Sequence, residues 1–293
     1  MSDGLPGTGL PGTGLPGVRD VPLRVLPVPR LLGRARAAMG GRGSIHLVER
    51  HARVYRHMWL ILASGVAEPL FYLLSIGVGL GQLVGSVTGP GGHPVGYATF
   101  VAPALLASAS MNGAIFDSTF NVFFRLKYEK LYDAALATPM RAGDVALGEI
   151  SWALLRGGLY ALAFMLVMLA LGLVHSVWAV LALPVTVLTG FAFAAAGMAA
   201  TTYMRSWQHF EFVTLAALPM FLFSTTFYPL GVYPRPLQIL VECTPLYQSV
   251  SLLRGLTLGA VTPALLWSAG YLALMGLVGL CVAGARIGRL LLT

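Results

Sequence analysis

Six long runs of apolar residues determine what this chain can fold into. They cover roughly residues 60–84, 97–122, 150–173, 177–203, 210–228 and 264–285. A run of about 20 mainly apolar residues is long enough to cross the hydrocarbon core of a bilayer as a helix. Only 10% of the residues are charged, whereas soluble domains carry about 25%. The sequence therefore predicts an all-α polytopic membrane protein with six transmembrane helices.

Basic residues lie mainly between these runs. Nine of the 19 Lys and Arg residues precede residue 57, and most others fall in 125–149 or near the C-terminus. Because Lys and Arg stay on the cytoplasmic side of a bacterial inner membrane, this pattern predicts that both termini are inside. It also explains the net charge of +8 without binding of nucleic acid. Arg235 and Arg254 are exceptions in a predicted outer segment.

The N-terminal region divides into two parts. Residues 1–43 begin with the repeat GLPGT-GLPGT-GLPG and are rich in Gly, Pro and Arg, which predicts a disordered cytoplasmic tail. That tail is either a linker or a segment that binds anionic lipid or a partner. Residues 44–59 place apolar side chains on one helical face and basic ones on another, which predicts an amphipathic elbow helix in the headgroup plane. The alternative is that they form the frayed start of the first span.

The outer segment between spans five and six is unusually apolar. Four prolines interrupt residues 229–258, at positions 229, 234, 236 and 245. Non-helical backbone at membrane depth needs cover from protein or a water-filled cavity. The segment therefore predicts two short re-entrant or interfacial helices, separated at Thr244–Pro245. A seventh full span is the competing interpretation, and it would place the C-terminal arginines outside.

No catalytic or metal-binding motif is present in the sequence. It contains no G-x-x-x-x-G-K-[ST] phosphate loop, no H-E-x-x-H and no G-x-S-x-G, so no ATPase, zinc protease or serine hydrolase site is expected. Its two cysteines and six histidines lack ligand spacing. We expect no enzyme activity and no cofactor in this chain.

The first inner segment contains an amphipathic stripe that suits docking of a partner. Its apolar anchors and charged edges are Lys127, Tyr128, Lys130, Leu131, Tyr132 and Leu136. Such a stripe either docks a cytoplasmic partner or lies on the membrane surface. Thr138–Pro139 ends the pattern, because the residue before proline disfavours the helical region.

Charged residues inside spans are expected to be functional. Glu68 lies beside Pro69 in the first span, where it caps broken backbone, pairs with another span or faces a cavity. We interpret Asp117, which lies toward the inner end of the second span, as part of a candidate translocation path with Glu68, Ser108 and Asn112. A partly polar face also runs along the second span. That face contains Ser108, Asn112, Phe116 and Thr119. Glu149 and Arg156 share one face of the third span, and we expect them to pair with each other.

Several short motifs resemble a known family. They are EPLFYLLSIGVGLG at 68–81, RLKYEKLY at 125–132, ATPM at 137–140, GEI at 148–150, PMFLFS at 219–224, YPL at 228–230, PLQ at 236–238 and TPL at 244–246. In order and spacing they resemble the ABC type-2 exporter permeases of the nodulation-type lipo-oligosaccharide and drug-resistance branch. The resemblance covers roughly residues 50–290.

This resemblance implies an ABC type-2 transmembrane domain over 44–293 that forms a homodimer or pairs with a paralogous permease. A separate ATPase subunit would bind ATP and Mg and dock on a coupling helix at Lys127–Ala137. The outer gate would include Tyr228, Pro229 and Pro245, and the cargo would be an amphiphile such as a lipid-linked saccharide or a hydrophobic drug. One departure lies in residues 223–228 (FSTTFY), where many relatives have Ser-Gly before two aromatic residues.

Two other functions fit the composition. A proton-coupled secondary transporter would use Glu68 and Asp117 as coupling acids. Such carriers often show an internal repeat, and the first three spans do not resemble the last three. An enzyme acting on membrane lipid would need polar residues clustered at one membrane face, and no such cluster is evident in the sequence.

Overall fold

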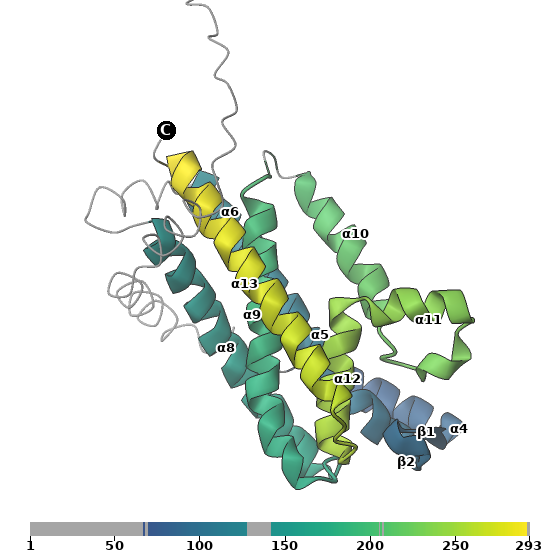
Figure 1. The fold of residues 1–293 in the computed structure, drawn as a ribbon. Coiled ribbons are helices and arrows are strands. Elements are labelled where there is room, and N and C mark those ends of the chain that lie inside the picture. The colour runs from purple at the N-terminus through teal and green to yellow at the C-terminus, as the bar shows by residue number, and fades with distance from the viewer. Residues whose placement is uncertain (1–66, 68–69, 128–141, 205, 207, 292–293) are drawn as a thin grey trace, which may run out of the picture.

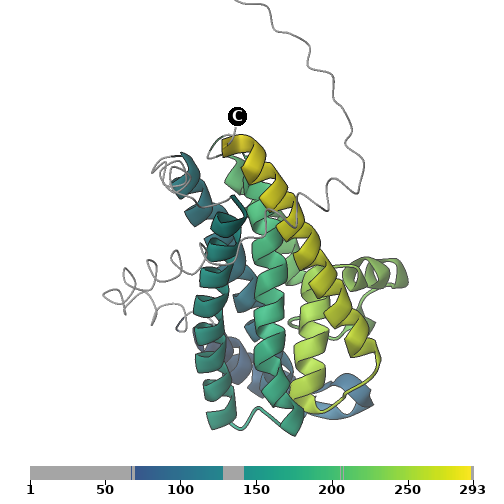
Figure 2. The ribbon, with the colours of Figure 1, turned by 60° about the vertical axis from the view of Figure 1, so that its left-hand side comes forward.

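The computed structural model describes residues 67, 70–127, 142–204, 206 and 208–291. Figure 1 shows a bundle of long helices, and Figure 2 shows the same bundle turned by 60°. The predicted tail, the elbow helix and Glu68 lie outside the described residues. The predicted coupling helix lies there too, except for Lys127, which ends a described helix.

The described chain is mainly helical. The first helical segments are η1 (Leu73–Leu80) and α4 (Gly81–Val84), followed by strands β1 (Ser86–Thr88) and β2 (Pro94–Gly96). A continuous helix follows, made of α5 (Tyr97–Phe116), η3 (Asp117–Asn121) and α6 (Val122–Lys127). The remaining long helices are α8 (Ala142–Ala170), α9 (Ala182–Thr201), α10 (His209–Leu222), α11 (Arg235–Glu242), α12 (Pro245–Leu258) and α13 (Ala264–Leu291). Short 3-10 turns are η2 (Pro90–Gly92), η4 (Val177–Leu181) and η5 (Leu230–Val232).

Four helical stretches are long and apolar enough to cross a membrane. They are Tyr97–Arg125, Ala146–Ala170, Val177–Thr201 and Ala264–Ile287. Two shorter apolar helices, Leu70–Val84 and His209–Leu222, fall in the first and fifth predicted runs. Each of the six predicted runs therefore contains an apolar helix, and four of these helices reach the full length of a span.

The helix in the fifth run ends earlier than the sequence predicted. The apolar run extends to residue 228, but α10 stops at Leu222. Beyond it, Thr225 has a φ of +60°, a left-handed conformation that costs a β-branched residue about 1–2 kcal/mol. The backbone turns here because tertiary contacts hold it, as described below for Arg254.

Helices α9 and α13 make the closest backbone approach. A Cβ added to Gly279 on α13 would lie 2.7 Å from the carbonyl carbon of Ala195 on α9, so no larger residue fits at this position. Small residues on α9, including Ala192, Ala194 and Ala195, are fully buried. Because lipid tails provide no hydrophobic drive between helices, such close packing supplies much of the attraction between them.

The segment 85–96, between the first and second apolar runs, contains a β-hairpin. Strands β1 and β2 pair antiparallel with Val87 opposite Val95. Two consecutive glycines, Gly91 and Gly92, adopt φ values of +82° and +81° and reverse the chain between the strands. Strands of three residues are too short to show an alternating pattern, so the sequence did not reveal them.

The apolar outer segment forms two helices, α11 and α12, with a break at Cys243–Thr244. The Thr244 hydroxyl accepts a hydrogen bond from the backbone N–H of Tyr247 and caps α12, while Pro245 occupies the first turn, where its missing N–H costs nothing. The proline pattern predicted this break. Figure 1 shows α11 lying across the direction of the long helices.

Candidate functional site

Two ion pairs join α8 to the continuous helix α5–η3–α6. Arg125 on α6 contacts Glu149, and Asp117 on η3 contacts Arg156. The Asn121 amide also donates to Asp117 Oδ1 at 2.9 Å. Asp117 and Arg156 are each only 9% exposed and Glu149 is 5% exposed. We call the end of the bundle that carries Arg125, Arg286 and the start of α8 the basic end.

The predicted pairing of Glu149 with Arg156 is wrong. These residues lie seven positions apart on one face of α8, a separation of about 10.5 Å along the axis. That face packs against the continuous helix, which presents Arg125 and Asp117 as the opposite charges. Glu149 and Arg156 are therefore each paired with a residue of the continuous helix. Residue spacing within α8 alone could not reveal these partners.

These ion pairs flank the segment that carries the predicted docking residues. Helix α6 ends at Lys127 and α8 begins at Ala142, so residues 128–141 connect two helices that are tied by buried charges. Removing one partner of a buried pair is strongly destabilising, because it leaves the other charge uncompensated. Asp117 also begins a π-helical turn, a local feature often found at functional positions.

The polar face predicted on the second span does not form one surface. Ser108 is buried and its hydroxyl donates to the carbonyl of Ala104 at 2.9 Å, and Thr119 donates to the carbonyl of Ile115 at 2.6 Å. Asn112, in contrast, is exposed. Each four-residue step advances about 40° around a helix, so the face moves from the core at Ser108 to the surface at Asn112. The three-residue step from Phe116 then returns it to the core at Thr119. Asn112 is therefore a polar group on an outer face of a long apolar helix.

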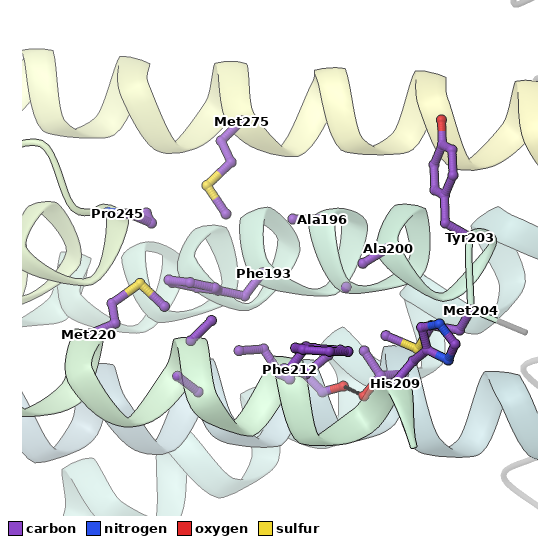
Figure 3. Close-up of a pocket in the computed structure, with 16 residues that line it drawn as sticks. Phe193, Ala196, Ala200, Tyr203, Met204, His209, Phe212, Met220, Pro245 and Met275 are labelled. Atoms are coloured by element: carbon purple, nitrogen blue, oxygen red, sulfur yellow. Dashed lines mark hydrogen bonds between the residues drawn. The ribbon is translucent and has the colours of Figure 1, made fainter. Parts of the chain in front are cut away.

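A cavity of about 510 Å³ lies between α10 and the helices α9 and α13. Figure 3 shows Phe193, Met220 and Met275 toward one end and Tyr203, Met204 and His209 toward the other. The lining is almost wholly apolar, with small residues on both facing helices. Those residues are Ala196, Gly197 and Ala200 on α9 and Ala216 and Ala217 on α10. We call this cavity the α10 groove.

The sequence did not predict the α10 groove. Its small residues on α9 lie in the run GFAFAAAGMAA at 190–200, which indicates close helix packing. That prediction holds where α9 packs against α13. On another side of α9, however, small residues of the same run line the α10 groove. A run of small residues allows either outcome, and the position of α10 decides between them.

Arg254 on α12 is the most deeply placed cation among the described residues. Its Nε donates to the carbonyl of Phe100 at 3.1 Å, and an Nη donates to the carbonyl of Thr225 at 2.9 Å. The guanidinium also stacks on the Phe100 ring, 3.7 Å from its centroid. Burial lowers the pKa of Arg254 to about 9, which leaves it protonated at neutral pH. Arg254 thereby joins α5, α12 and the turn that follows α10.

The turn held by Arg254 contains three buried hydroxyl residues. Ser224, Thr225 and Thr226 are all buried, and the Ser224 and Thr226 hydroxyls lie 2.7 Å apart. Thr225 adopts the positive φ that a glycine would adopt without strain. The hydrogen bonds from Arg254 to Thr225 stabilise the turn and offset this backbone strain. The only sequence signal for Arg254 was a lone arginine in an apolar outer segment.

The residues predicted for an outer gate lie in two different surroundings. The ring of Tyr228 packs against that of Tyr233 with centroids 5.3 Å apart, and Pro229 precedes the short turn η5. Pro245 instead lines the α10 groove, at the end opposite Tyr203 and His209 (Figure 3). Burial, followed by the Tyr228 hydroxyl, raises the pKa of Tyr233 above its usual range, so Tyr233 remains a neutral phenol.

Long apolar helices and buried cross-helix charges define a multi-pass helical membrane protein. Comparison with known sequences identifies the family. The family model described as ABC-2 type transporter matches residues 45–258, so the chain belongs to the ABC-2 type transporter family. It is a permease, a multi-pass transport subunit of a kind that fits a bacterial inner membrane.

The relatives agree with this assignment. The chain is 36% identical over 199 residues to Nodulation protein J of Rhizobium leguminosarum bv. trifolii, covering 68% of this chain and 74% of the relative. It is 30% identical over 263 residues to Nodulation protein J of Rhizobium leguminosarum bv. viciae, covering 89% and 100%. It is 32% identical over 200 residues to Nodulation protein J of Rhizobium meliloti, covering 68% and 74%.

Proposed function

We propose that this chain is the transmembrane subunit of an ATP-driven exporter whose ATPase is a separate polypeptide. The observation that carries the proposal is the match to the ABC-2 type transporter family over most of the chain. The chain lacks a phosphate-binding loop, so hydrolysis has to occur on a partner. The cargo is an amphiphile, such as a lipid-linked saccharide or a hydrophobic drug.

In this proposal the protein has six spans, with both termini and the basic end in the cytoplasm. The opposite end carries the β-hairpin and the exposed aromatic residues Trp178 and Trp267. Tryptophan is enriched at the level of the lipid headgroups. Helices α11 and α12 then lie near the outer face.

The ATPase docks on the segment between α6 and α8, through Leu131, Tyr132 and their neighbours. The ion pairs Arg125–Glu149 and Asp117–Arg156 support this assignment, because they link both flanks of the segment. A push on the docking segment is then transmitted to α5 and α8 together, instead of being absorbed by one flexible helix end.

Two copies of the permease, or one copy and a paralogue, enclose the path. Asn112 supports this arrangement, since an exposed amide on a membrane helix is stabilised where it faces a polar path or another helix. Glu68 is a second candidate for the path. Asp117 suits proton coupling poorly, because it is already engaged in a buried ion pair with Arg156.

The test is a pull-down of the tagged full-length protein from its native membrane, with identification of the proteins that accompany it. We expect a stoichiometric ATPase, and we expect the double substitution of Leu131 and Tyr132 by Asp to abolish that association. Val177→Asp, at an exposed position of the opposite end, is the matched control and should retain the ATPase. Co-purification that persists in the double variant would contradict the docking assignment.

The path assignment has its own test. Glu68→Gln and Asn112→Ala are expected to lower export while the ATPase remains bound. Normal export by either variant would remove that residue from the path. A homo-oligomer that recovers no ATPase, under detergent conditions that keep known complexes intact, would favour the proton-coupled carrier.

A further inference from the structure

The α10 groove is open to the surroundings of the bundle. Ala200 on α9 and Phe212 and Ala216 on α10 line it and are exposed, and Figure 1 shows α10 standing apart from α9 and α13. In a membrane the surroundings of these helices are hydrocarbon. Apolar walls that face empty space lose their dispersion contacts, and an apolar chain in the groove would restore them.

The length of the groove corresponds to one leaflet. On α10 it runs from His209 to Met220, and eleven residues of helix span about 16 Å. Half of a hydrocarbon core of about 30 Å is about 15 Å. A single acyl chain that enters from the basic end would therefore occupy the groove along its full length.

The basic end of the groove carries the polar groups. Tyr203 and His209 line it there, and the Arg286 guanidinium lies over the Tyr203 ring at 4.0 Å from its centroid. Arg286 Nε is buried, and among the described residues it has no hydrogen-bond partner. Glu211, the acidic residue in the first turn of α10, is exposed and does not line the groove. Arg286 does not line the groove itself, but its contact with Tyr203 places a cation beside the polar end.

We propose that the α10 groove binds one acyl chain of an anionic phospholipid from the leaflet at the basic end. Its phosphate lies at Arg286, where the guanidinium donates to phosphate oxygens. The bound chain supplies the packing that α10 lacks against α9 and α13. The site is separate from the docking segment and does not depend on the identity of the cargo.

The experiment uses the purified full-length protein in nanodiscs and phosphatidylglycerol with a photoreactive group on one acyl chain. We expect cross-links to peptides of α9 and α10. Ala216→Phe fills the groove from an exposed position and should lower that cross-linking at least fivefold. Ala200→Phe fills the groove from the opposite wall and should lower cross-linking in the same way. The two variants are independent, so the test remains valid if one of them folds poorly. Ala170→Phe, exposed at the end of α8, is the matched control and should leave cross-linking unchanged.

The headgroup is tested with phosphatidylglycerol and phosphatidylcholine that carry identical chains, by counting bound lipids in native mass spectra. We expect the protein to prefer phosphatidylglycerol by about tenfold and Arg286→Gln to remove that preference. Equal binding of the two lipids by the unmodified protein would overturn the headgroup assignment. Cross-linking unaffected by both filling variants would overturn the site. A change of oligomeric state with unchanged lipid binding would show that a second copy occupies the groove.

Discussion

Replacing Asp117 by Asn tests the buried ion pair with Arg156 most directly. The substitution keeps the side-chain shape but removes the charge, and Arg156 is only 9% exposed. Leaving one member of a buried pair without its counter-charge costs about 3–5 kcal/mol. Globular domains have a total stability of about 5–15 kcal/mol, so the loss should be obvious in thermal unfolding of the purified protein followed by circular dichroism.

The double variant Asp117→Asn with Arg156→Gln separates the pair from its individual members. Removing both charges is often close to neutral, so we expect the double variant to recover most of the lost stability. Glu211→Gln, at an exposed position on α10, is the matched control and should change little. Equal destabilisation of the single and double variants would refute the reasoning. A stable Asp117→Asn protein that no longer transports would instead support the proton-coupled carrier.

Two further substitutions test the packing of the bundle. Gly279→Leu should lower the free energy of unfolding by about 1–3 kcal/mol, because the Cβ of the leucine would lie 2.7 Å from the Ala195 backbone. Thermal unfolding followed by circular dichroism measures this loss. Gly284→Leu is the control, since its Cβ would meet nothing within 4 Å. An equal loss in the control would show that the contact with the Ala195 backbone is not responsible. Thr225→Gly should raise stability by about 1 kcal/mol, because glycine adopts the φ of +60° without strain. A decrease would mean that the contacts of the Thr225 side chain outweigh the backbone strain.

Much of the architecture is local information, and the sequence was sufficient to predict it. Each apolar run contains a helix because backbone polar groups in lipid have to be satisfied within the segment. The break between α11 and α12 could be predicted for the same kind of reason. Pro245 cannot donate a hydrogen bond in a helix interior, and Thr244 before it is a good cap.

The pairing of charges required the tertiary structure. Glu149 and Arg156 lie on one face of α8, and the sequence alone favoured a pair within that helix. The structure instead pairs them with Arg125 and Asp117, because the rotation and depth of two packed helices decide which charges meet. The β-hairpin was missed because strands of three residues are too short to show a periodic pattern.

By itself the sequence determined that this is a membrane protein. It also determined which segments contain helices and where proline interrupts them. These properties depend on residues that are neighbours along the chain. Only the tertiary structure decided that α9 packs tightly against α13 yet leaves a groove toward α10. It also decided that Arg254 is buried against Phe100 and Thr225. The physical reason is that a small residue or a lone cation is compatible with several packings, and only the placement of distant helices selects one of them.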